Sequence, residues 1–161
     1  MAATSTNKQP LLVDRVLHEV VDLQGATVTQ NGGISIGGTN NAVPVIDSTS
    51  SDGCIIEDVY AISRTEGYTI KLYISTANDY LRPQQGVFIG EFESTGTEAG
   101  TRASWDAMPK ILAPVAQTGN ESQFQALYIP RGKVLWAAVE AKSANDQATN
   151  APLIGVQGGW Y

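Results

Sequence analysis

The chain has 161 residues, of which 42% are hydrophobic and 16% are charged, with a formal net charge of −6 at pH 7. This length predicts a single domain that buries roughly 70% of the surface of its unfolded chain. The acidic balance argues against a general affinity for nucleic acid or for anionic membranes, because both require a basic surface. A single cysteine, Cys54, excludes an internal disulfide; beside an apolar strand, it is expected to be a small buried hydrophobe.

The chain is expected to divide into an N-terminal arm over residues 1–10 and one β-sandwich domain over residues 11–161. The arm, MAATSTNKQP, is polar, rich in small residues and without an apolar leader region. No apolar run approaches the length that spans a membrane. We therefore expect a protein made in a cytoplasm, or released from one by lysis.

The segment Leu11–Leu23 fits either a strand or a helix. Leu12, Val13, Val16, Leu17 and Val20 would form a helical stripe. Its four valines favour a strand instead, and no clear N-cap precedes it, so a strand is the preferred prediction. The next segment, Gly25–Gly38, predicts a hairpin turning at Asn31-Gly32-Gly33.

Residues Gly53–Thr76 contain the best-defined strand pattern. Tyr68, Ile70, Leu72 and Ile74 alternate with polar residues, as in a half-buried strand. The preceding stretch, from Cys54 to Ile62, is apolar on both faces except at Glu57 and Asp58. Between the two, Thr65-Glu66-Gly67 offers a glycine for a positive φ, which predicts a hairpin in the middle of a sheet.

Further strands are expected along the rest of the chain. They are Ala42–Ile46, where Pro44 indicates an edge or a bulge, and Val87–Phe92, Phe124–Ile129, Lys133–Ala141 and Leu153–Tyr161. Pro130-Arg131-Gly132 has the composition of a turn. About ten short strands without a confident helix predict an all-β, antiparallel, jelly-roll-like sandwich.

Few residues suggest chemistry. His18 is the only histidine, which leaves too few ligands for a histidine-based metal site and no evident catalytic triad. Glu91 and Glu93 share a strand face and could form a glycosidase pair, although a solvated face is the simpler interpretation. Trp136 is expected to pack in the core, whereas Trp105 and Trp160 are expected to be surface or interface anchors.

The last hundred residues carry a resemblance to a known family. The succession VYAISRTEGYTIKLYIST, VFIGEFES, LYIPRGKVLWAAVEA and GVQGGWY, with the turn at Pro130–Lys133 and the closing Gly158-Gly159-Trp160-Tyr161, resembles jelly-roll-like capsid decoration (cement) proteins of tailed bacteriophages. The likeness covers about Gly53 to Tyr161. It implies a non-enzymatic virion protein, assembled in the host cytoplasm, that binds the major capsid protein on the outside of the shell, commonly as a trimer.

Two alternatives remain beside the capsid hypothesis: a carbohydrate-binding sandwich of a tail or fibre using Trp105 and Trp160, and a glycoside hydrolase using Glu91 or Glu93. For the capsid hypothesis we expect no catalytic residue, no cofactor and no metal, and neither nucleic acid nor membrane as partner. The expected partner-interface residues are Lys8, Pro10, Leu11, Leu12, Trp105, Trp160 and Tyr161.

Overall fold

The computed structural model describes residues 14–28, 42–76, 86–96, 98–108, 110–111, 124–143 and 146–161. These residues form twelve β-strands and no helix. In chain order the strands are β1 (Arg15–Asp22), β2 (Thr27–Val28), β3 (Val43–Asp47), β4 (Gly53–Ile62), β5 (Thr69–Thr76), β6 (Val87–Glu93), β7 (Arg102–Ser104), β8 (Lys110–Ile111), β9 (Phe124–Gln125), β10 (Leu127–Pro130), β11 (Lys133–Glu140) and β12 (Leu153–Trp160). The all-β prediction is confirmed.

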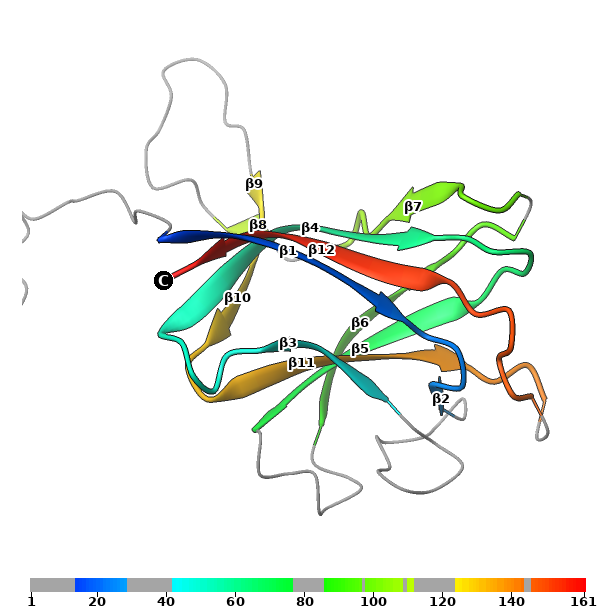
Figure 1. Ribbon diagram of the computed structural model, residues 1–161, viewed down its shortest axis with the longest axis horizontal. Helices are drawn as coiled ribbons and strands as arrows, with labels where there is room; N and C mark the ends of the chain where they lie inside the picture. The colour runs from blue at the N-terminus through cyan, green and yellow to red at the C-terminus, as the bar shows by residue number, and fades with distance from the viewer. Residues whose placement is uncertain are drawn as a thin grey trace, which may run out of the picture.

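The strands form two stacked five-stranded sheets and one small strand pair (Figure 1). Sheet A has the order β1-β12-β4-β10, with β7 beside β4, and sheet B has the order β2-β11-β5-β6, with β3 beside β11. The strands β8 and β9 pair with each other. The pairing is antiparallel except between β2 and β11, which run parallel. The predicted sandwich is therefore present, with one parallel pair that the sequence did not indicate.

The strand order is that of a jelly roll. When β1, β3, β4, β5, β6, β10, β11 and β12 are renumbered one to eight, sheet A reads 1-8-3-6 and sheet B reads 2-7-4-5. This order arises from two interlocked Greek keys, in which the chain crosses repeatedly between the two sheets. Two short strands complete the sheets. β2 pairs with the end of β11 that lies beyond its pairing with β3, and β7 pairs with the end of β4 that lies beyond its pairing with β10.

The best-defined strands of the sequence do not form the predicted hairpin. β4 pairs with β12, β10 and β7 in sheet A, whereas β5 pairs with β11 and β6 in sheet B. The intervening turn carries the chain from one sheet to the other. Gly67 is not among the positive-φ glycines of the described residues. A β-carbon on it would instead lie 2.9 Å from the carbonyl oxygen of Ser94, so close approach of two backbones explains this glycine.

A bulge in β4 changes which residues face the core. Gln157 pairs with Asp58 while the next residue, Gly158, pairs with Ile56, so Glu57 is an extra residue in β4. Ile56 and Val59 consequently both enter the core, and Tyr60 lies on the outer face. Strict alternation, which would put Glu57 and Asp58 on opposite faces of the strand, therefore does not hold here, and both lie outside the core.

The main core lies between the two sheets and is built from aliphatic residues of both. The central strands of sheet B are buried on their outer face as well. Tyr73, Val134 and Trp136 form a second cluster there, and the Nε1 of Trp136 donates to the Oγ of Ser75 at 2.6 Å. Trp136 is thus a packing residue, as predicted, although β5 is not the half-exposed strand that its alternation suggested.

Two local predictions are confirmed and one lies outside the described residues. The strand interpretation of Leu11–Leu23 holds over Arg15–Asp22. Pro44 lies in the edge strand β3 at an irregularity of its register with β11, which fits both positions expected for it. The hairpin turn at residues 31–33 falls outside the described residues.

Candidate functional site

The structure places only part of the expected partner interface. Lys8, Pro10, Leu11 and Leu12 lie outside the described residues. Of the other three residues, Trp160 and Tyr161 end the chain beside the start of β1, at the left of Figure 1, while Trp105 lies elsewhere, after β7.

Trp105 is a core residue, and its expected role as a surface anchor is a wrong prediction. Its side chain is 3% exposed and stacks on Phe92 with a centroid separation of 6.4 Å. The ring also lies against Gly90 of β6, where a β-carbon would come within 2.3 Å of Cζ2. Trp105 therefore closes the sandwich between β7 of sheet A and β6 of sheet B, and its ring is not available for sugar stacking.

Trp160 and Tyr161 are half-buried and differ in what they contact. Trp160 packs against the core, with the guanidinium of Arg15 5.6 Å from its ring centroid. Tyr161 pairs with Tyr128 at a centroid separation of 6.4 Å. Burial, reinforced by Tyr128, Cys54 and Glu57, raises the pKa of the Tyr161 phenol. Both residues keep part of their surface exposed, and their role in a partner interface stays a prediction.

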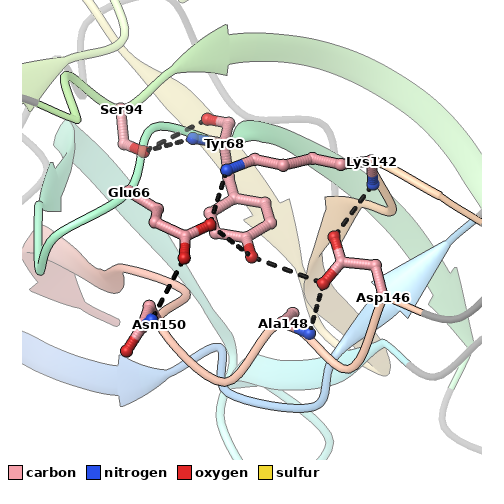
Figure 2. A network of polar contacts seen from close by, with 7 residues as sticks. All are labelled: Glu66, Tyr68, Ser94, Lys142, Asp146, Ala148 and Asn150. Carbon is pink, nitrogen blue, oxygen red and sulfur yellow. Dashed lines mark hydrogen bonds and ion pairs between the residues drawn. The ribbon is translucent and has the colours of Figure 1, made fainter.

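Figure 2 shows a polar network between two sheet-to-sheet crossings, β4 to β5 and β11 to β12. The Nζ of Lys142 donates to Glu66 at 2.8 Å and lies 4.0 Å from the ring centroid of Tyr68. The Nδ2 of Asn150 donates to the same carboxylate at 3.1 Å. The Tyr68 hydroxyl lies 3.3 Å from Glu66 and 3.4 Å from Asp146.

The pKa values in this network indicate a structural role. The network of Glu66, Tyr68, Lys142, Asp146 and Asn150 holds the two crossings together and is called here the clamp. The hydrogen bonds from Lys142 and Asn150 lower the pKa of Glu66. Burial alone would raise the pKa of Asp146, but the backbone N–H groups of Lys142 and Ala148 outweigh it and lower that pKa. Burial, together with the two carboxylates, raises the pKa of Tyr68 to about 12. Each group is thus held in the protonation state that binds its neighbours, which suits a structural role.

The glycosidase candidate Glu91 has a structural partner. It lies opposite Lys71 in the register of β5 and β6, and its carboxylate is 3.8 Å from the Lys71 Nζ. Glu140 approaches the same ammonium at 2.8 Å. Glu93 is exposed at the end of β6. An ion pair with a buried lysine accounts for Glu91 without a substrate.

His18 and Cys54 also have structural roles. The Nε2 of His18 lies 3.0 Å from the hydroxyl of Tyr60. The Tyr60 ring crosses Gly155 on the outer face of sheet A and lies 3.9 Å from the guanidinium of Arg102. Cys54 is fully buried, and burial raises the pKa of its thiol to about 11, in agreement with the prediction of a buried hydrophobe.

The outer face of sheet A carries an apolar row that the sequence interpretation missed; it is exposed at its two ends, whereas Ile55 is half-buried and Gly159 is buried. In register across four strands, Val16 of β1 faces Gly159 of β12, Gly159 faces Ile55 of β4, and Ile55 faces Tyr128 of β10. Val16 is 79% exposed and Tyr128 is 51% exposed. The row and the adjacent Tyr161 are called here the terminal apolar row. The sequence offered one indication of this row: Val16 is apolar although it neighbours Leu17, so in a strand the two side chains lie on opposite faces.

Neither a metal site nor a membrane-spanning helix is evident among the described residues. No three His, Cys, Asp or Glu side chains among them lie where they could hold a metal ion. The described part of the chain also contains no helix with the length and hydrophobicity needed to cross a membrane.

Comparison of the chain with protein-family models, with curated proteins and with solved structures gives no match.

Proposed function

We propose that this protein is a structural component of a phage virion that binds the outer surface of the capsid and stabilises it without catalysis. The observation that carries the proposal is the terminal apolar row, with Val16 79% exposed on a jelly-roll scaffold. Exposed apolar surface of this kind is typical of protein–protein contact. Viral capsid proteins are among the proteins that use jelly rolls, although fold alone does not define function.

The scaffold suits this role because it is rigid around the exposed surface. The strands beneath the row continue directly into core residues: Leu17 follows Val16, Cys54 and Ile56 flank Ile55, and Leu127 and Ile129 flank Tyr128. Strand backbone held by such packing has little further freedom to lose on binding, which favours affinity. Self-association, expected as a trimer, belongs to the same proposal.

The test is binding to decoration-free empty capsids assembled from the major capsid protein of the same phage. The purified chain is expected to sediment with the capsids and to raise the temperature at which they disrupt. Absence of cosedimentation, together with an unchanged disruption temperature, would contradict the proposed function. Catalytic activity of the isolated chain on a glycan would contradict its non-enzymatic part.

A further inference from the structure

The outer face of sheet A has the composition of an interface centre. Besides Val16 and Ile55 it presents two tyrosines, Tyr128 and Tyr161, whose rings lie 6.4 Å apart. Tyrosine is among the residues that supply most of the binding energy at the desolvated centres of protein interfaces, and the aliphatic neighbours help to exclude water from them. Gly159 is itself buried and adds no side chain to the middle of the row, so a broad protein surface fits the row better than a small ligand does.

The carboxylate of Glu57, beside the row, indicates which charge a partner should carry. Glu57, the extra residue of the β4 bulge, is exposed and close enough to Tyr161 to raise the pKa of that phenol. It forms no ion pair within the described residues. An unpaired carboxylate beside an apolar row favours a partner with an apolar centre and a basic group at its rim.

The sequence immediately ahead of β1 is also apolar. Residues 1–13 contain Leu11, Leu12 and Val13, and their one charged residue is Lys8. They lead through Asp14 into β1, two residues before Val16.

A second copy of this chain is a poorer occupant for two reasons. Two copies stacked through this face would bring two Glu57 carboxylates together in a protein of net charge −6. Pairing through the edge of β1 is opposed by Arg15 and Glu19, exposed charged residues that alternate with Leu17 on its core-facing side. Inward-pointing charges are a device that prevents edge-to-edge pairing.

We infer that the terminal apolar row, with Glu57 at its rim, is the surface that docks on the capsid protein, through an apolar patch bordered by a basic residue. This inference rests on the proposed function. Trimerisation, where it occurs, would then use another surface.

The experiment compares matched double variants in the capsid cosedimentation assay. Val16→Thr with Tyr128→Thr removes apolar surface from the row while it keeps residues that favour strands. The control is Val87→Thr with Phe88→Thr in β6, where the side chains are 66% and 51% exposed on sheet B. We expect the first pair to weaken capsid binding by at least about tenfold and the control pair to leave it within about twofold.

A charge reversal tests the rim. Glu57→Lys is expected to weaken capsid binding and to reduce its dependence on salt, whereas Glu93→Lys on sheet B is expected to do neither. Circular dichroism and thermal melting check that every variant is folded.

The outcomes separate the two proposals. If the unaltered chain does not bind capsids, the proposed function fails, and this inference fails with it. If the unaltered chain binds and the row variants bind equally well, only the assignment of the surface is overturned. The assignment is also overturned if the row variants abolish self-association, measured by light scattering, and leave capsid binding intact.

Discussion

The indole of Trp105 lies so close to Gly90 that a β-carbon on the glycine would come within 2.3 Å of Cζ2. The Nε1 of the same indole is buried without a hydrogen-bond partner among the described residues. The pair closes one side of the sandwich through shape alone, which makes its energetics testable.

Gly90→Ala is expected to lower the free energy of unfolding by about 1–3 kcal/mol, because the added methyl overpacks the site. Trp105→Phe should restore part of this loss, since it shortens the ring and removes the unpartnered N–H group. The double variant is therefore expected to be more stable than the sum of the two single effects, by urea denaturation. Strict additivity would show that the two residues do not share this packing.

The clamp of Figure 2 predicts that stability falls in acid. The folded pKa values of Glu66 and Asp146 lie below their ordinary values of 4.5 and 3.8. Their contribution is therefore fully present above those ordinary values and is lost as pH falls through the lower, folded values. The melting temperature should decrease below about pH 4.5.

The matched variants for that measurement are Glu66→Gln and Asp146→Asn, with Glu93→Gln as the exposed control. Each of the first two is expected to lower the melting temperature at neutral pH and to flatten its acid dependence. The control should leave both unchanged. An acid dependence that is identical in all three variants would assign the effect to other carboxylates.

Two buried tyrosines should ionise at a higher pH than exposed tyrosines do. Burial, with nearby carboxylates, raises the pKa of Tyr68 and of Tyr73 to about 12. Because these folded values exceed the ordinary value of 10, their stabilising contribution is present below pH 10 and is lost as pH rises toward about 12. Ultraviolet absorbance of phenolate should show a late step that shrinks in both Tyr68→Phe and Tyr73→Phe. Complete titration near pH 10 in the folded protein would contradict the burial of these phenols.

Cys54 is expected to be inert in the folded protein. Its thiol is fully buried with a pKa of about 11, so little thiolate is present or accessible at mildly alkaline pH. An aromatic disulfide reagent should label it slowly in native buffer and completely after unfolding in guanidinium chloride. Rapid labelling of the native protein would show that β4 opens readily.

The positions of most strands were predictable because each is a local pattern of apolar residues and turn residues. Leu153–Tyr161 and Lys133–Ala141 agree with β12 and β11 to within about one residue. Pairing was not predictable, since β4 and β5 are adjacent in sequence but belong to different sheets. The bulge at Glu57 was equally hidden, because a bulge depends on the partner strand as much as on its own sequence.

The candidate interface was likewise predictable only in part. Trp160 and Tyr161 were proposed from their place at the aromatic end of the chain; the structure places Tyr161 beside Tyr128 of the row and packs Trp160 against the core. Trp105 was misjudged because its burial depends on Gly90 in a strand formed earlier in the chain. The terminal apolar row joins residues from four strands, and no local pattern links Val16 to Tyr128.

By itself, the sequence determined that the described part of the chain is all-β, that its strands are short and where most of them lie, because alternation and turn chemistry act over a few residues. Only the tertiary structure decided the jelly-roll order, the side that Trp105 faces and the row across sheet A. Those features depend on contacts between residues far apart in the chain, and the free energy of such contacts is set by packing rather than by local preference.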